Sequence, residues 1–276
     1  MLEQEASKTA LGVALMRAAH QFLDSPPLLF EDPLALPLLG PDGEKMIRAH
    51  IDRHQTVYGR GLRCHVCLRS RFTEDRLRQA GADRYVLVGA GLDTFALRQP
   101  DWAKSLHILE IDHPATQAKK REAIAKAGWK EPENLTFAAV DFTRVSLSDV
   151  LKRQQIAPHE KVFFSWLGVT MYLTETEIDA SLGAMAHVSD HASVSLTFKQ
   201  PDRGQGDKAM RELVAALGEA FVSVFTPDEM AAKLAAHGFV NQEFLTPERA
   251  TTEYFTPPRS DVSVPRRSGI VYAATI

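Results

Sequence analysis

The chain has 276 residues, of which 45% are hydrophobic and 24% charged, and its formal net charge is −3. These proportions are those of a globular domain whose core needs no disulfide framework, and they argue against nucleic acid or an anionic membrane surface as partner. Only two cysteines occur, residues 1–10 lack the apolar core of a signal peptide, and no apolar run reaches the roughly 20 residues that span a bilayer. We therefore expect a cytoplasmic protein.

Residues 1–81 predict helices that are interrupted by one proline-rich segment. Residues 7–23 have an amphipathic helical pattern that begins at Ser7. Residues 24–40 contain four prolines and predict a loop with at most one short helix. Residues 43–80 contain no proline and predict helix, with a break near Gly59–Gly61. We expect this region to be a helical cap within the same domain as the rest of the chain.

From residue 82 on, short apolar runs alternate with helical patterns. This alternation predicts an α/β fold with a doubly wound, mostly parallel sheet over residues 82–276. The predicted strands are 84–88, 105–111, 135–140, 161–167, 192–198, 239–245 and 270–275. The predicted helices are 114–126, 146–154, one that begins at Thr174, 206–220, and one from Thr226 to Gly238. The prolines and arginines of 257–267 predict a surface loop.

A glycine turn follows the first predicted strand. Gly89, Ala90 and Gly91 stand between that strand and a predicted helix. The two glycines permit a tight turn and the close approach of a ligand to the backbone. Packing alone also selects glycine in such turns, so the motif by itself is weak evidence for a cofactor.

Acidic and aromatic residues stand at the ends of the next strands. Glu110 and Asp112 end the second strand, and Asp112 lies 21 residues beyond Gly91, near the roughly 20-residue spacing at which an acid meets ribose hydroxyls. The third and fourth strands end in further candidates, namely Asp141, Phe142 and Trp166. Ligands of open α/β sheets bind at the carboxyl ends of the strands, so these positions together predict a nucleoside cofactor site.

Two residues of the turn distinguish between cofactors. A dinucleotide motif needs a third glycine where this chain has Thr94, and Asp93 would repel a pyrophosphate. S-adenosylmethionine carries no phosphate, and nearby acids suit its sulfonium, its ammonium and its ribose diol. The pattern favours S-adenosylmethionine over NAD, and the chain also lacks the Tyr-x-x-x-Lys pair of many NAD-dependent oxidoreductases.

Several segments together resemble a known family. The segments are VLVGAGLDTFALR, LEIDHPATQAKKR, AVDF and FFSWLGVTMYL, with RAAHQ, EDPLA and LRSRF before them. They resemble the leucine carboxyl methyltransferase-like family of class I S-adenosylmethionine-dependent O-methyltransferases, over roughly residues 7–200. The resemblance implies a seven-stranded, Rossmann-like sheet whose last strand is antiparallel.

The resemblance also implies roles for individual residues. Leu167 stands where the family often has glutamate, so one polar contact to the cofactor is expected to be missing. The implied roles are: Arg69, with Arg71 as the competing candidate, for the cofactor carboxylate; Gly89, Ala90 and Gly91 for the turn under the methionine moiety; Asp112 with Glu110 for the ribose; and Asp141 and Phe142 for the adenine. Trp166 is a further cofactor-binding candidate because of its position at the end of the fourth strand.

The acceptor is predicted only as a chemical class. A carboxylate is ionised near neutral pH and needs no general base, whereas a phenol or an alcohol usually does. No dedicated base stands out among His20, His113 and His187, which favours a small carboxylic acid as acceptor. The aromatic residues Phe95, Trp166 and Tyr172 are candidates for the wall of the acceptor pocket.

Two other functions and one metal site are alternatives to this hypothesis. An NAD-dependent oxidoreductase and a non-catalytic binding module remain as alternatives. Cys64 and Cys67, with His50 and His54, have a spacing that could suggest zinc. Zinc needs four converging ligands, and these residues lie in one helical stretch, so no metal site is predicted.

Overall fold

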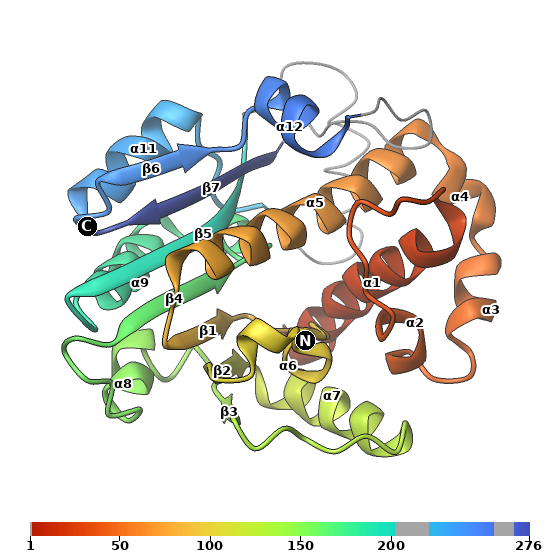
Figure 1. Cartoon of the computed structure of the whole chain (residues 1–276), viewed down its shortest axis with the longest axis horizontal. Helices are drawn as coiled ribbons and strands as arrows, with labels where there is room; N and C mark the ends of the chain where they lie inside the picture. The colour runs from red at the N-terminus through yellow and green to blue at the C-terminus, as the bar shows by residue number, and fades with distance from the viewer. Residues whose placement is uncertain (1, 202–220, 257–267) are drawn as a thin grey trace.

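The computed structural model describes residues 2–201, 221–256 and 268–276, and its centre is a seven-stranded sheet of order β3-β2-β1-β4-β5-β7-β6 (Figure 1). Strands β1 to β5 pair in parallel, and β7 runs antiparallel to both β5 and β6. The predicted mostly parallel sheet with an antiparallel last strand is confirmed. The bounds are β1 (Arg84–Val88), β2 (His107–Asp112), β3 (Leu135–Ala139), β4 (Lys161–Trp166), β5 (His191–Lys199), β6 (Asn241–Phe244) and β7 (Ser268–Ala274).

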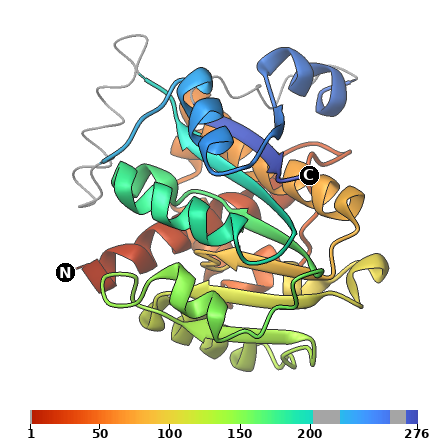
Figure 2. The same cartoon turned by 90° about the vertical axis from the view of Figure 1, so that its left-hand side faces the viewer.

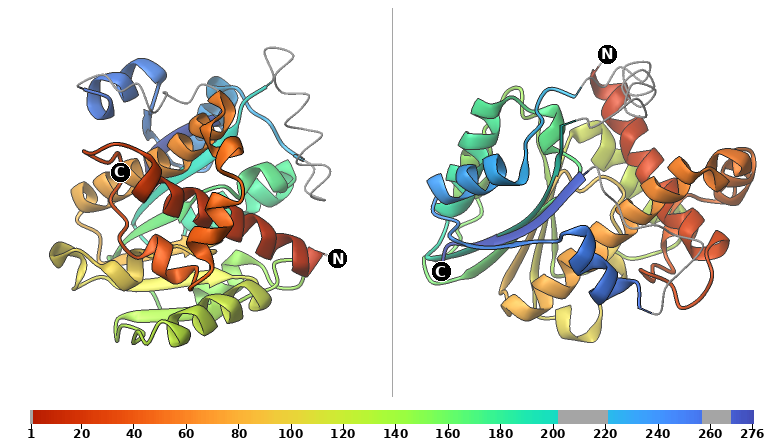
Figure 3. Two further views of the ribbon diagram at one scale, coloured as in Figure 1. Left: turned by 90° about the vertical axis from the view of Figure 1, so that its right-hand side faces the viewer. Right: turned by 90° about the horizontal axis from the view of Figure 1, so that it is seen from above.

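Helices cover both faces of this sheet. Helices α8, α9 and α11 lie on one side, and α1 and α5 lie on the other (Figure 3, right). Side chains of a strand alternate between faces, so Val86 and Val88 join the core under α8, α9 and α11, whereas Tyr85 and Leu87 join the core under α5. The bounds on these two sides are α1 (Leu2–Leu23), α5 (Val57–Ala80), α8 (Leu147–Lys152), α9 (Glu175–Ala186) and α11 (Pro227–Ala236).

The N-terminal region is a group of helices beside the sheet. Helix α1 packs against α2 (Ala35–Leu38), α3 (Gly43–Arg48), α5 and α7 (Pro114–Lys126). The short helix α2 lies within the predicted proline-rich loop, and α1 begins earlier than the predicted residue 7. In Figure 2 the first turn of α1 projects to one side of the sheet, and the C-terminus lies on the other.

The predicted break near Gly59–Gly61 is wrong. Helix α4 (Ile51–Gln55) ends before Thr56, and α5 then runs unbroken through both glycines. Thr56 has an extended backbone, and its hydroxyl oxygen accepts a hydrogen bond from the Gly59 N–H at 2.9 Å. A Cβ atom at Gly59 would lie 2.1 Å from the carbonyl oxygen of Arg53. Glycine at this position therefore permits close contact with the preceding helix rather than ending one.

Differences at the C-terminal end are small. Strand β6 is shorter than the predicted strand 239–245, because the Phe239 N–H donates to the carbonyl oxygen of Leu234 at 3.0 Å and so belongs to the end of α11. Helix α12 (Pro247–Tyr254) was not predicted, although Thr246 and Pro247 repeat the helix start found at Thr226 and Pro227. The predicted helix 206–220 and the predicted loop 257–267 lie outside the described residues.

Among the described helices, none combines the length and the apolar character that crossing a bilayer requires.

Candidate active site

The turn after β1 is held against the end of β2. The N–H groups of Gly89 and Ala90 both donate to the carbonyl oxygen of Ile111, at 2.9 and 3.2 Å. Gly89 has φ +76° and Gly91 has φ +54°, in the left-handed region that favours glycine. A Cβ atom at Gly89 would lie 2.5 Å from Cγ2 of Val169. Backbone conformation and close contact therefore both require glycine at position 89.

We expect Gly89→Ala to lower the free energy of unfolding more than Gly128→Ala does. Both positions have φ above +70°, but a Cβ atom at Gly128 meets no atom within 4 Å. The control should cost about 1–2 kcal/mol for the left-handed backbone alone. The clash with Val169 should add about 1–3 kcal/mol. Urea unfolding of both variants measures the difference, and equal losses would contradict the contact with Val169.

Asp112 is fixed at the same turn from the neighbouring strand. One carboxylate oxygen accepts the Gly91 N–H at 2.5 Å, and the other accepts the His113 N–H at 2.6 Å. Burial raises the pKa of Asp112, while these two backbone N–H groups act in the opposite direction. The structure thus brings the predicted ribose ligand into direct contact with the glycine turn.

Glu110 lies on the same face of β2, two residues earlier, but it is enclosed. Its side chain is 1% exposed, and Oε2 lies 2.5 Å from Nζ of Lys120, which α7 contributes. Burial raises the pKa of Glu110, and Lys120 opposes that shift. Oε1 has no hydrogen-bond partner among the described residues. Glu110 therefore has one oxygen committed to Lys120 and one that is unpaired.

The end of β3 adds a carboxylate and an exposed ring. The Val140 N–H donates to the carbonyl oxygen of Asp112 at 2.8 Å, which places this end beside that of β2. Asp141 accepts hydrogen bonds from the Thr143 hydroxyl at 2.6 Å and from the Thr143 N–H at 2.9 Å, and they lower its pKa. Phe142 is 43% exposed, which is unusual for a large aromatic side chain. Both predicted adenine contacts therefore stand at the strand end.

The end of β4 is more buried than the end of β3. Trp166 is 1% exposed and belongs to the core under α8 and α9, and its Nε1 has no hydrogen-bond partner among the described residues. Gly168, with φ +76°, follows the strand, and its N–H donates to the Thr197 hydroxyl at 2.7 Å. Leu167, between them, is partly exposed. The next turn carries Tyr172, whose ring centroid lies 6.0 Å from that of Phe221.

Arg69 of α5 lies against Gly168. A Cβ atom at Gly168 would lie 2.7 Å from Nη1 of Arg69, so the missing side chain leaves room for the guanidinium. Arg69 is 9% exposed, and its Nε is buried with no hydrogen-bond partner in the described ranges. Burial and the nearby Arg17 lower the pKa of Arg69 to about 10. No carboxylate of the described residues pairs with it, which leaves a buried cation at the strand ends.

Arg71, the competing candidate, is in a different environment. Its Nε donates to both carboxylate oxygens of Asp75, at 2.9 and 3.1 Å, and its side chain is 47% exposed. Its guanidinium also lies 5.9 Å from the ring centroid of Tyr254. The geometry therefore favours Arg69 for an anionic ligand.

A buried polar network connects α1 to the glycine turn. Arg17 of α1 contacts Asp32 at 2.7 Å and Asp93 at 2.5 Å, and the Thr94 hydroxyl donates to Asp32 at 2.6 Å. Although burial acts to raise it, Arg17 holds the pKa of Asp93 well below its ordinary value. The sequence resemblance included all three segments, but it gave no sign that they meet.

The position of Asp93 in this network distinguishes dinucleotides from cofactors without phosphate. The second oxygen of Asp93 accepts the Phe95 N–H at 2.7 Å, at the start of the four-residue helix α6 (Phe95–Arg98). A dinucleotide pyrophosphate needs free N–H groups at such a helix start and no carboxylate beside them. The turn therefore suits a cofactor without phosphate.

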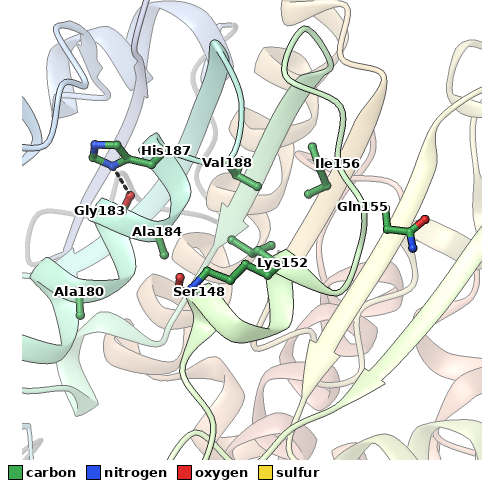
Figure 4. Close-up of a pocket in the computed structure, with 10 residues that line it drawn as sticks. Ser148, Lys152, Gln155, Ile156, Ala180, Gly183, Ala184, His187 and Val188 are labelled. Carbon is green, nitrogen blue, oxygen red and sulfur yellow. Dashed lines mark hydrogen bonds between the residues drawn. The ribbon is translucent and has the colours of Figure 1, made fainter.

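The three histidines considered as general bases each form a hydrogen bond with another residue of the protein. His20 lies 2.6 Å from Asp24, and Nδ1 of His113 accepts the Ala115 N–H at 3.2 Å. Nδ1 of His187 lies 2.7 Å from the carbonyl oxygen of Gly183 (Figure 4). Sequence reasoning missed a fourth histidine, His65, which lies one helical turn from Arg69 on α5 and is 6% exposed.

A cavity and a cysteine pair lie apart from these strand ends. The cavity has a volume of about 510 Å³ between α8 and α9, and none of the predicted site residues lines it (Figure 4). Cys64 and Cys67 are buried side chains of α5, and burial raises the pKa of Cys67. The described ranges contain no group of three or more potential metal ligands.

Comparisons with known proteins agree with the fold and identify the family. The family model for leucine carboxyl methyltransferase matches residues 10–186. YktD of Bacillus subtilis, provisionally named an S-adenosyl-L-methionine-dependent methyltransferase, is 30% identical over 300 residues, covering 95% of this chain and 96% of that protein.

Two solved structures share the fold at low sequence identity. A DUF574 family protein from Streptomyces avermitilis has a TM-score of 0.59 at 12% identity, covering 87% of this chain and 94% of its own. A provisionally named methyltransferase from Thermobifida fusca has a TM-score of 0.56 at 17% identity, covering 86% and 91%. With the family model matching well over half of its length, the chain belongs to the leucine carboxyl methyltransferase family of S-adenosylmethionine-dependent methyltransferases.

Proposed function

We propose that the chain transfers the methyl group of S-adenosylmethionine to a carboxylate oxygen of a small-molecule acceptor. The observation that carries the proposal is the buried guanidinium of Arg69, which has no carboxylate partner among the described residues and lies against Gly168 at the strand ends. An unpaired buried cation is costly, and an anionic ligand group removes that cost. The carboxylate of the cofactor's methionine moiety is such a group.

The other strand-end residues suit the remaining parts of the cofactor. The turn of Gly89, Ala90 and Gly91 permits close approach of the methionine moiety, and Asp112 accepts the ribose hydroxyls. The remaining contacts in this proposal are Asp141 and Phe142 with the adenine, Trp166 through its unpaired indole N–H, and Glu110 through its unpaired oxygen.

Methyl transfer requires the protein mainly to align the acceptor with the cofactor and to exclude water. When bound, the cofactor supplies a methyl group activated by a sulfonium. The acceptor carboxylate is already ionised near neutral pH and forms its new C–O bond as the C–S bond breaks, so no proton has to move. The three structurally committed histidines are consistent with an acceptor that needs no base.

The N-terminal helices complete this proposal as a cap. We assign residues 1–81 to the cap and 82–276 to the cofactor-binding core, within one domain. A Cβ atom at Gly91 would lie 3.4 Å from Cβ of Ala10, so α1 comes close to the glycine turn. A cap in this position excludes water from the reacting groups. The two cysteines are buried thiols, which suits a reducing cytoplasm.

Isothermal titration with S-adenosylmethionine and S-adenosylhomocysteine tests the cofactor. We expect wild type to bind both, and Asp112→Ala to bind about 10- to 100-fold more weakly, because the ribose and the Gly91 N–H both lose a charged acceptor. Asp101→Ala is the matched control, because it removes an exposed aspartate whose carboxylate pairs with Lys104. A folded wild-type protein that binds neither compound would overturn the proposal, and an NADH fluorescence titration would then test the oxidoreductase alternative.

The product tests the acceptor class. With cofactor labelled in the methyl group and a panel of carboxylic acids, we expect a methyl ester, from which alkali releases labelled methanol. Alkali-stable label would indicate methylation of a phenol or an alcohol instead. Cofactor binding without transfer to any acid would favour the non-catalytic module.

A further inference from the structure

A second group of buried cationic and imidazole side chains continues from Arg69 along α5 and β5. The two elements run antiparallel, and the Thr73 hydroxyl of α5 lies 2.6 Å from the Ser195 hydroxyl of β5. Four residues of helix rise about 6 Å and two residues of strand about 6.6 Å, so each turn of α5 advances two residues of β5. Counting from the contact between Thr73 and Ser195, Arg69 lies beside Thr197. One helical turn earlier, His65 lies beside Lys199.

Other contacts agree with this register. The Thr197 hydroxyl accepts the Gly168 N–H at 2.7 Å, and Gly168 is the residue against which the Arg69 guanidinium lies. The charges of Arg69 and Lys199 both lower the pKa of His65, so both side chains lie near its ring. Arg69, Lys199 and His65 therefore form one cluster at the carboxyl ends of β4 and β5.

The cluster is buried and contains two cationic side chains. His65 is 6% exposed, Lys199 8% and Arg69 9%. Nδ1 of His65 and Nε of Arg69 are both buried, and neither has a hydrogen-bond partner in the part of the chain that the structure describes. Burial, Arg69 and Lys199 lower the pKa of His65 to about 3, and no carboxylate contributes to that shift. An anion placed here would be stabilised by two cations in a medium of low polarity.

An apolar wall adjoins the ammonium group. Nζ of Lys199 lies 6.0 Å from the ring centroid of Phe221, which in turn lies 6.0 Å from that of Tyr172. The Phe225 N–H donates to the carbonyl oxygen of Lys199 at 2.9 Å and so fixes the end of β5. Anion-binding groups next to aromatic rings suit a molecule with one charged end and an apolar body.

We propose that Lys199 and His65 bind the carboxylate of the methyl acceptor, beside the guanidinium that holds the cofactor. This inference rests on the proposed function and assigns the acceptor a carboxylate and an apolar body. One carboxylate oxygen is held by the ammonium of Lys199, and the other is the nucleophile. It bonds to the methyl carbon as the C–S bond breaks and its electron pair returns to sulfur, giving a methyl ester and S-adenosylhomocysteine. Methylation removes the acceptor's charge, which weakens its hold on the cluster and favours release.

Octanoate and octanamide are the probes, because they share an apolar chain and differ in charge. The protein is saturated with S-adenosylhomocysteine and titrated with each. We expect wild type to bind octanoate about tenfold or more tightly than octanamide, as a charge-assisted hydrogen bond in a buried site implies. Lys199→Met should abolish that preference and leave affinity for S-adenosylhomocysteine within about twofold, and Lys199→Arg should retain it. His65→Phe should reduce the preference, since one polar partner is lost.

Lys161→Met is the matched control, because Lys161 is an exposed lysine at the amino end of β4, opposite the carboxyl ends where the cluster lies. It should leave the preference unchanged. Equal affinity of wild type for the two probes, or a preference that survives Lys199→Met, would overturn the inference. So would a loss of S-adenosylhomocysteine binding in Lys199→Met, which would assign the lysine to the cofactor. Failure of the proposed function is a separate result: wild type then does not bind S-adenosylhomocysteine, while its preference for octanoate is still measured directly.

Discussion

Replacing Arg69 with methionine should abolish tight cofactor binding while leaving the apoprotein at least as stable as wild type. Arg69 is the buried cation to which we assign the cofactor carboxylate, and truncating one partner of a buried charge pair costs about 2–5 kcal/mol of binding, or roughly 30-fold or more in affinity. In the apoprotein the same guanidinium has no carboxylate partner within residues 2–201, 221–256 and 268–276, so a well-packed apolar side chain should not destabilise the fold. Titration with S-adenosylhomocysteine measures the affinity, and thermal unfolding without ligand measures the stability.

Arg71→Met separates this effect from a general loss of positive charge on α5. Arg71 is exposed and paired with Asp75, one helical turn away, so its removal should change cofactor affinity by less than about twofold and stability by less than about 1 kcal/mol. If Arg71→Met loses the cofactor and Arg69→Met keeps it, the assignment of the two arginines is reversed.

The second large effect is expected at Arg17. Arg17→Met leaves the carboxylates of Asp32 and Asp93 without their main partner, and Asp32 is fully buried. Breaking a buried pair by removing one partner costs about 3–5 kcal/mol, so urea unfolding should show a loss of that size. Arg48→Met, which removes an exposed partner of Glu44, should cost less than about 1 kcal/mol. A comparable loss in both variants would show that the buried network contributes little.

The pH dependence of Arg17→Met has a definite sign. In wild type, Arg17 holds the folded-state pKa of Asp93 below its unfolded value of about 3.9, so this stabilisation is present above that pH and is lost as pH falls further. Without Arg17, burial is opposed only by Lys120, Arg98 and the Phe95 N–H, so the folded-state pKa of Asp93 rises and the folded variant takes up a proton at higher pH than folded wild type. The stability deficit of the variant should therefore shrink as pH falls from 7 toward 5. Asp93→Asn in the Arg17→Met background should recover part of the loss at pH 7.

If Arg17→Met does not fold, the double variant still tests the network. Its asparagine keeps the side-chain oxygen that accepts the Phe95 N–H but carries no charge to be left unpaired. A double variant no more stable than the single one would contradict the electrostatic explanation.

Local sequence patterns were sufficient to predict the sheet and the residues at the carboxyl ends of its strands. Strand periodicity, helix caps and the glycine turn depend on residues close together in the chain, so Gly89, Asp112, Asp141 and Trp166 were placed correctly at the strand ends. The prediction at Gly59, in contrast, was wrong, because this glycine lies within α5 and does not break a helix. Its role depends on the backbone of α4 lying 2.1 Å from where a Cβ atom would be, and local patterns do not report such an approach.

Which charged side chains meet depends on how the helices and strands pack together. Arg69 and Arg71 are two residues apart in one helix, and their different environments follow from which side of α5 packs on the sheet. Arg17 and Asp93 are 76 residues apart, and His65 and Lys199 are brought together by the antiparallel course of α5 along β5. The free energy of such contacts depends on burial and distance, which arise only when the elements pack, so the residues that bind charge at this site were decided by the fold as a whole.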